Sequence, residues 1–285
     1  MHPCRHTVTL AVLVLALGAC GDSNDPGDDP LPNDAATAVG LTVRDNIEAA
    51  FDGFHPRRLL EPLSTGVADE PCVTPSAATD TDGDGIPNAA QYTFTAPPCE
   101  FDVRGFTLNV VGQLRIEDPA PEAPGFGANI TITNLRFTLD HEEAEREYSV
   151  TRNGLMSLTG DPAGLALTTD LQVVRTFSGL PDAFAEHVWT LGFDPETTLQ
   201  INQPLPSGSV SAAGTVTWTR GDESFELTVT TVTPLHYDAG CSQPGQRFDE
   251  GELSVAGTFG ETPGAVHVRW EECGRDPRIE FIEAE

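Results

Sequence analysis

Apolar and polar residues alternate along most of the chain from Gln91 to the C-terminus. In GFTLNVVGQLRIED, for example, Phe106 and Leu108 are apolar, whereas Thr107 and Asn109 are polar. Successive side chains of a β-strand point to opposite faces, so this pattern predicts strands with one buried and one solvated face. The pattern recurs often enough to predict about ten strands. Turn sequences such as GDPAG, TRGDES and FGETPGA separate them.

Consecutive strands with no helix between them predict an antiparallel meander over residues 101–285, and hence an all-β fold. The meander is compatible with a barrel, with a sandwich, or with a sheet that curls around an N-terminal helix. An outer-membrane barrel would alternate too, but 7% aromatic residues and the polar end EFIEAE argue against it. In ANITITNLRFTLD the apolar set changes parity between Ile132 and Leu135, which predicts a β-bulge near Asn134.

Residues 35–70 have the period of a helix instead. In AVGLTVRDNIEAAFDGF an apolar residue recurs at every fourth position, which places the set on one helical face. The set consists of Val39, Val43, Ile47 and Phe51. Pro56 should end this helix, and RRLLEPL is compatible with a second helical turn.

The chain before this helix has two parts of different composition. Residues 1–19 combine a short head carrying Arg5 with an apolar run that is too short to span a bilayer, which is typical of a secretory signal peptide. Residues 20–34 consist mainly of Asp, Pro, Gly and Asn. Such a segment cannot bury enough apolar surface to fold, so we expect a flexible tether.

The signal ends in LGAC, which resembles the lipobox of bacterial lipoproteins. The resemblance implies that the signal is removed before Cys20 and that acyl chains are attached to this cysteine. Lipids at Cys20 would anchor the chain to a membrane without a transmembrane helix. In enteric bacteria an aspartate in the next position retains a lipoprotein at the inner membrane. This chain has Gly21 there, so the resemblance implies a cell-envelope protein of the outer membrane.

The chain has 6 cysteines, and four remain when Cys4 and Cys20 are set aside. An even number in an exported chain indicates disulfides, with three possible connectivities. We favour pairing between neighbours, because each pair then brackets one local excursion of the chain. The expected pairs are Cys72 with Cys99 and Cys241 with Cys273. A metal site is the less favoured use, since no C-x-x-C spacing occurs.

Acidic residues outnumber basic ones by 44 to 15, and the formal net charge is −29. Nucleic acids and anionic membrane surfaces would be repelled by this charge, so we expect no nucleic-acid partner. The charge favours cations or simply solubility. A solvated acidic surface, as in a salt-tolerant or high-GC organism, is the simpler interpretation.

The stretch DTDGDGIPN, residues 80–88, places three aspartates at alternating positions of a glycine-rich turn. Carboxylates spaced in this way can all point to one hard cation. The stretch resembles the calcium loops of EF-hands, dockerins and thrombospondin type 3 repeats. The resemblance implies a calcium ion held within the disulfide-bracketed segment 71–100. The implied ligands are Asp80, Asp82, Asp84, the backbone carbonyl of Ile86, and Asn88.

This loop departs from the EF-hand in two respects. Gln91 stands where the EF-hand has a bidentate glutamate, and Pro75 and the strand-like QYTFT replace the flanking helices. We therefore expect a weak structural site rather than a switch. An acidic turn that binds no ion is the alternative.

Other motifs favour structural interpretations. DHEEAERE, around His141, lacks the H-E-x-x-H spacing of a zinc site and is typical of a solvated hairpin tip. The tripeptide RGD at 220–222 matches an integrin-recognition motif but falls where a hairpin turn is needed. The histidines are scattered, and those on strands with a solvated face, such as His267, are interpreted as surface residues. No nucleophile elbow, paired-histidine signature or phosphate loop is present, so we assign no catalytic residue.

Three functions remain open. The leading hypothesis is a lipid-anchored, non-catalytic envelope protein that binds a partner or serves as structure. In its lipobox, acidic tether and Thr-rich strands the chain is similar to exported lipoproteins without a known activity. The alternatives are a carrier of a lipid or other hydrophobic ligand inside a β-barrel, and a secreted hydrolase. The interior of the domain discriminates between them: it would be filled, hollow or opened by a cleft. The aromatic residues expected to fill it are Trp218, Phe225, Phe259 and Trp270.

Overall fold

The computed structural model describes most of the chain. The described residues are 32–55, 72–76, 78–103, 106–141, 146–177, 181–241 and 247–284. The predicted signal peptide, the lipidation site Cys20 and most of the predicted tether lie outside these ranges, as do RRLLEPL and residues 142–145.

One helix and a twelve-stranded sheet make up the described chain. Helix α1 (Pro32–Phe51) continues into a short 3₁₀ turn, η1 (Asp52–Phe54). The strands that follow are β1 (Val73–Pro75), β2 (Ala90–Val103), β3 (Phe106–Glu117), β4 (Ala128–His141), β5 (Arg146–Asp161), β6 (Gly164–Phe177), β7 (Ala183–Pro195), β8 (Gly208–Arg220), β9 (Glu223–Tyr237), β10 (Phe248–Phe259), β11 (Thr262–Trp270) and β12 (Arg278–Glu283).

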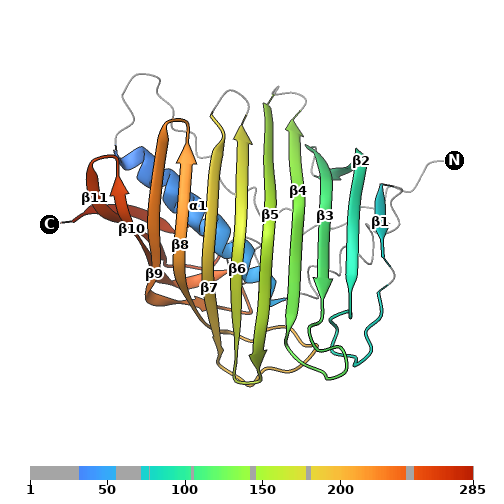
Figure 1. Ribbon diagram of the computed structural model, residues 1–285. Coiled ribbons are helices and arrows are strands. Elements are labelled where there is room, and N and C mark those ends of the chain that lie inside the picture. The colour runs from blue at the N-terminus through green and yellow to red at the C-terminus, as the bar shows by residue number, and fades with distance from the viewer. Residues whose placement is uncertain are drawn as a thin grey trace.

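Each strand pairs with its sequence neighbours, so that the order across the sheet is β1 to β12. All these pairings are antiparallel, as in a meander of hairpins, and β1 and β12 are the two edges of the described sheet. Figure 1 shows a broad sheet whose last strands, β10 and β11, turn behind it, with α1 lying against the inner face. The predicted all-β class, the antiparallel meander and the single N-terminal helix are confirmed.

Two boundaries differ from those predicted. Helix α1 begins at Pro32 rather than at residue 35, because proline is compatible with a first helical turn, where its missing N–H is not needed. The sheet begins at Val73 rather than at residue 101, because β1 and most of β2 lie within the segment assigned to the acidic loop. Only the central part of that segment forms a loop.

The predicted apolar face of α1 is the face that the sheet covers. Val39, Val43, Ile47 and Phe51 are all 0% exposed. The helix packs against β10, β11 and β12, and η1 packs against β5 and β6. Each fully buried side chain of this size contributes about 1.5–3 kcal/mol, so the helix is an integral part of the core. Among the described residues, no helix combines the length and apolar character needed to cross a bilayer.

The predicted bulge lies on β4. The pairing of β4 with β5 shifts between Ile132 and Leu135, and Asn134 has a φ of 46°. Gly112 on β3 lies directly beside the bulge, where a Cβ atom would approach the backbone oxygen of Asn134 to 2.3 Å. The extra residue therefore explains the change of parity in the sequence.

Candidate metal centre

The acidic loop connects β1 to β2 at one edge of the sheet. A disulfide between Cys72 and Cys99, whose Cα atoms are 5.3 Å apart, joins the two strands near the base of the loop. The backbone N–H of Ser76 donates to the carbonyl of Gln91 at 2.8 Å and closes the base further. The predicted pairing of these cysteines is confirmed, and it fixes both ends of the loop.

The glycines of DTDGDG allow the chain to wrap around the first aspartate. The carboxylate of Asp80 accepts hydrogen bonds from the backbone N–H groups of Gly83 at 2.8 Å and Gly85 at 2.9 Å. Gly83 and Gly85 have φ angles of +79° and +89°, which residues with a Cβ rarely adopt. The alternation of aspartate with glycine is thus what this tight turn requires.

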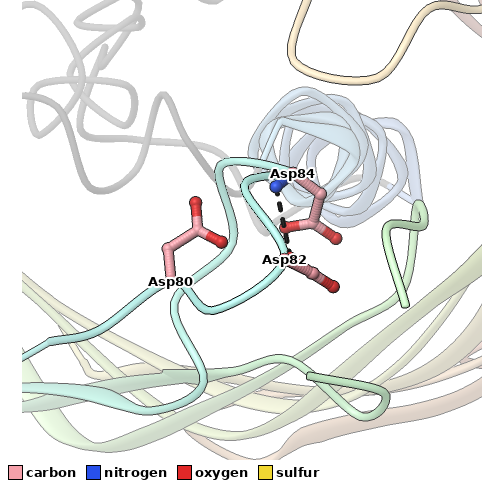
Figure 2. Close-up of side chains that lie close together, drawn as sticks. All are labelled: Asp80, Asp82 and Asp84. Atoms are coloured by element: carbon pink, nitrogen blue, oxygen red, sulfur yellow. Dashed lines mark hydrogen bonds between the residues drawn. The ribbon is translucent and has the colours of Figure 1, made fainter. Parts of the chain in front are cut away.

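The three aspartates converge. Asp80, Asp82 and Asp84 each offer one carboxylate oxygen, and these oxygens lie within 4.8 Å of one another. Figure 2 shows the three side chains around the turn, with the backbone N–H of Asp84 donating to Asp82 at 3.2 Å. Carboxylate oxygens are the ligands of hard cations, so this cluster could hold a metal ion.

Asp84 is the most buried of the three, with 4% of its surface exposed. Its carboxylate accepts hydrogen bonds from the N–H groups of Ile86 at 2.8 Å and Gly125 at 3.0 Å. Burial is the largest cause that raises the pKa of Asp84, and the charges of Asp82 and Asp118 raise it further. A bound cation would offset both the desolvation and the repulsion.

Asp118 is a fourth acidic group beside the loop, and it lies outside the motif that predicted the site. It follows β3, is 8% exposed, and donates its backbone N–H to the carbonyl of Pro87 at 3.0 Å. One carboxylate oxygen of Asp118 and one of Asp82 are buried without a hydrogen-bond partner in the described structure. Buried carboxylate oxygens usually have a partner, so both observations fit the presence of a cation.

Asn88 closes the loop from the other side. Its side-chain oxygen accepts the backbone N–H of Thr81 at 3.0 Å, and its side-chain nitrogen donates to the Thr81 hydroxyl at 2.8 Å. These bonds give Asn88 a structural role. The predicted ligand roles of Asn88 and of the Ile86 carbonyl stay predictions.

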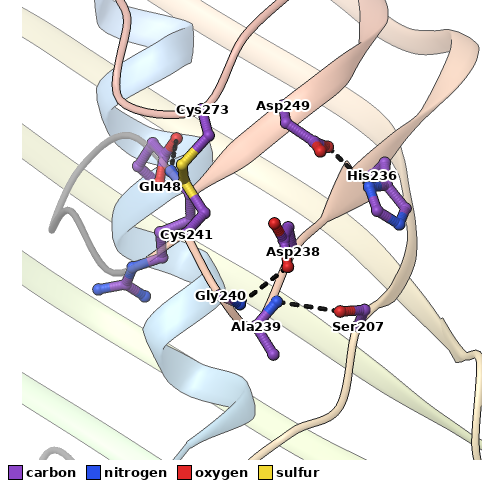
Figure 3. Close-up of a disulfide and its surroundings, with 10 residues drawn as sticks. Glu48, Ser207, His236, Asp238, Ala239, Gly240, Cys241, Asp249 and Cys273 are labelled. Atoms are coloured by element: carbon purple, nitrogen blue, oxygen red, sulfur yellow. Dashed lines mark hydrogen bonds and ion pairs between the residues drawn. A yellow bond between two sulfur atoms is a disulfide. The ribbon is translucent and has the colours of Figure 1, made fainter.

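The second predicted disulfide is confirmed as well. Cys241 and Cys273 are bonded, with their Cα atoms 5.8 Å apart, and Figure 3 shows the bond between two connecting segments beside α1. One segment follows β9 and the other follows β11. The bond therefore ties together the strands that curl behind the helix.

RGD forms the hairpin turn between β8 and β9, as expected. Arg220 ends β8 and forms an ion pair of 3.5 Å with Glu223, and Gly221 has a φ of 60°. His141 ends β4, but its side chain and most of its acidic neighbours lie outside the described part of the chain. The hairpin-tip interpretation of that cluster stays a prediction.

The surface interpretation of the strand histidines is wrong for His187, and His55, which follows η1, is buried as well. His187 and His55 are only 1% and 7% exposed. His187 faces inward because it alternates in phase with Ala185 and Trp189 on β7, both of which are buried. His236 and His267 do lie at the outer face, where each bonds a carboxylate: Asp249 and Glu252, both at 2.6 Å. Figure 3 shows the first of these pairs.

Comparison of the chain with protein-family models, with curated proteins and with solved structures finds no match.

Proposed function

We propose that this chain is a lipid-anchored, non-catalytic protein of the bacterial cell envelope, attached through Cys20 to the outer membrane. In this proposal the acidic loop holds one structural calcium ion, and the outer surface of the domain binds a partner or serves as structure. The observation that carries the proposal is the filled interior of the sheet.

The inner face of the sheet is occupied by α1 and by large aromatic side chains. Trp218, Phe225, Phe259 and Trp270 are at most 5% exposed. Cavities of about 80 Å³ and about 200 Å³ lie between the elements. Pockets that enclose drug-sized ligands have volumes of roughly 300–1,000 Å³. The packing therefore favours a solid domain over a carrier of lipid-sized molecules.

The histidines at the outer face do not favour the hydrolase. Both ring nitrogens of His236 bond carboxylates, at 2.6 Å to Asp249 and at 3.1 Å to Glu196, so neither can activate a nucleophile. His267 lies opposite Ser254 in the pairing of β10 with β11. Among the described hydrogen bonds, none joins these two side chains. A nucleophile and its base need such a bond.

The ligand chemistry suits hard cations, and calcium is the one we propose. The converging atoms are all carboxylate oxygens, and calcium accepts six to eight oxygen ligands in flexible geometry. Asp118 brings a further carboxylate to the side of the loop. Because no bidentate glutamate is present, we expect a dissociation constant of about 10⁻⁴ to 10⁻³ M, as in extracellular modules.

The anchor is tested by metabolic labelling of the full-length protein with an alkyne analogue of palmitate in a bacterial host. We expect label on the wild type and on Cys4→Ser, which changes the other N-terminal cysteine, and none on Cys20→Ser. Membrane fractionation should place the labelled protein in the outer-membrane fraction. Equal labelling of Cys20→Ser and wild type would overturn the proposed anchor.

A further inference from the structure

Three inward-facing polar side chains lie in successive rows of β5, β6 and β7. Arg175 of β6 lies opposite Val150, Arg152 of β5 lies opposite Val173, and His187 of β7 lies opposite Leu171. Helix α1 adds Asn46, which is 2% exposed. A polar cluster therefore lies between the helix and the sheet, in an otherwise hydrophobic core.

All but one of the arginines in this region have an acidic partner. Arg44 pairs with Asp45 at 2.7 Å and with Asp276 at 2.8 Å. Arg175 pairs with Asp45 at 3.5 Å, and Arg247 pairs with Asp52. These pairs neutralise the charges that α1 and the sheet bring together.

Arg152 is the exception. It is half-buried, and within the described structure it makes no ion pair or hydrogen bond. Desolvation is the first cause that lowers the pKa of Arg152, and the charge of Arg175 is the second. The charges of Asp52 and Asp45 act in the opposite direction, but neither forms an ion pair with Arg152 in the described structure. An arginine remains protonated, so Arg152 is a cation without a direct ion-pair partner among the described residues.

Two polar atoms near Arg152 lack a hydrogen-bond partner. They are the Nε of Arg175 and the Nε2 of His187, both buried without a partner in the described structure. Burial lowers the pKa of His187 to about 3, so the ring is neutral. Its Nδ1 lies 3.5 Å from the side-chain nitrogen of Asn46, which can only donate. The ring proton is therefore on Nε2, which makes this atom a donor as well.

A cavity of about 80 Å³ lies at this place. Arg152, His187, Asn46 and the ion-paired Asp52 form its polar part. The rest of its wall is apolar and includes Leu135, Phe137, Met156, Leu171 and Val173. The cavity has room for more than one water-sized group, since one water needs only about 10–15 Å³ of such volume.

We propose that this cavity binds a small monocarboxylate, with the carboxylate on Arg152 and a short aliphatic tail among the apolar side chains. The proposal does not depend on the function proposed above. Arg152 has no ion-pair partner among the described residues, while Arg175 is paired with Asp45 and the His187 ring is neutral, so the site matches one negative charge. Phosphate would place a second charge and further oxygens against apolar side chains, where no donor meets them. Burial of an aliphatic tail against the apolar wall is favourable, and inorganic anions lack such a tail.

The proposal is tested by titrating the purified full-length protein with hexanoate, using calorimetry and saturation-transfer NMR of the hexanoate methyl group. We expect wild-type protein to bind hexanoate more tightly than acetate. Arg152→Gln should weaken binding by about tenfold or more, because a charge-assisted hydrogen bond is lost. Arg115→Gln, which changes an exposed arginine on β3, should bind as the wild type does.

Asn46→Asp provides a second test, since it changes few atoms and places a carboxylate next to the same arginines. It should abolish hexanoate binding, because the protein then supplies the counter-ion itself. The proposal is overturned if Arg152→Gln or Asn46→Asp binds hexanoate as tightly as wild type. Equal binding of hexanol would overturn it too, as would phosphate binding without hexanoate binding.

Discussion

The carboxylate of Asp84 accepts a hydrogen bond of 3.0 Å from the backbone N–H of Gly125, which lies 41 positions later in the sequence. The bond joins the acidic loop to the connection between β3 and β4. Asp118, at the start of that connection, is bonded to the loop through Pro87. An ion held by the aspartates would therefore stabilise two segments at once, and its removal should be visible in global stability.

The first prediction concerns calcium removal. At a calcium concentration of ten times its dissociation constant, binding stabilises the fold by about 1.4 kcal/mol. For a domain of this size, this raises the melting midpoint in calcium by about 3–6 °C relative to the midpoint in chelator. Asp84→Asn should lose this difference, whereas Asp222→Asn, in the exposed turn between β8 and β9, should keep it. An unchanged wild-type midpoint at about 10 mM calcium, ten times the weakest expected dissociation constant, would remove the ion from the proposal.

The second prediction concerns Asp118, which raises the pKa of Asp84 through its charge. Asp118→Asn relieves repulsion in the ion-free protein and also lowers the attraction for a cation. The midpoint in chelator should therefore rise while the midpoint in calcium rises less, so that the gap between them narrows. Melting curves in both buffers measure that gap. A gap as wide as that of wild type would show that Asp118 does not act on the site.

The third prediction compares the two disulfides. They close loops with sequence separations of 27 and 32 residues, so each should contribute roughly 3–4 kcal/mol by restricting the unfolded chain. Replacing both cysteines of either pair by serine should thus destabilise the fold to a similar extent. Only the Cys72–Cys99 variant should also weaken calcium binding, because only that bond fixes the ends of the acidic loop. Similar calcium affinity in both variants would contradict this assignment.

Local patterns in the sequence were sufficient to predict the sheet and the helix. The strands were recognisable because one face of each is buried, and the face of α1 because Val39, Val43, Ile47 and Phe51 repeat with the helical period. The bulge at Asn134 was predictable for the same reason, since an extra residue changes parity. How far the sheet curls depends on strand twist and on packing against α1, which periodicity does not encode.

The same distinction between local spacing and long-range contacts applies to the site residues. Asp80, Asp82 and Asp84 form a local turn, so their spacing predicted their convergence. Asp118 reaches the loop only through the pairing of β2 with β3, and no local spacing indicates it. The inward position of His187 could have been inferred from its parity with Trp189. Arg152 could not, because β5 around Gly154 shows no regular alternation.

The fourth prediction tests whether α1 is part of the core. Ile47 is fully buried between the helix and the sheet. Ile47→Ala should lower the free energy of unfolding by about 2–5 kcal/mol, through lost burial and the cavity left behind. Thr37→Ala, at an exposed position of the same helix, should change it by less than about 0.5 kcal/mol. Urea unfolding followed by tryptophan fluorescence measures both. A loss below 1 kcal/mol for Ile47→Ala would mean that the helix is not tightly packed.

The last prediction concerns Glu48, which is 1% exposed and accepts the backbone N–H of Arg247 at 3.3 Å. Burial raises the pKa of Glu48 from 4.5 to about 7, although the charge of Arg247 acts in the opposite direction. The folded state therefore binds a proton that the unfolded state has released. This proton uptake stabilises the folded state. The stabilisation is fully present below pH 4.5 and is lost as the pH rises to about 7.

The shift in the pKa of Glu48 corresponds to about 3 kcal/mol between these pH limits. Glu48→Gln keeps the hydrogen-bond acceptor without the charge, so it should be more stable than wild type at pH 8 and gain little at pH 4.5. His187, whose pKa burial lowers to about 3, destabilises the fold as the pH falls below 6.5, but it does so equally in both proteins. Urea unfolding at the two pH values isolates the Glu48 contribution as the difference between variant and wild type. Glu226→Gln, on the exposed face of β9, should show no such difference. If the stability gain of Glu48→Gln were the same at both pH values, the buried carboxyl would not be titrating between them.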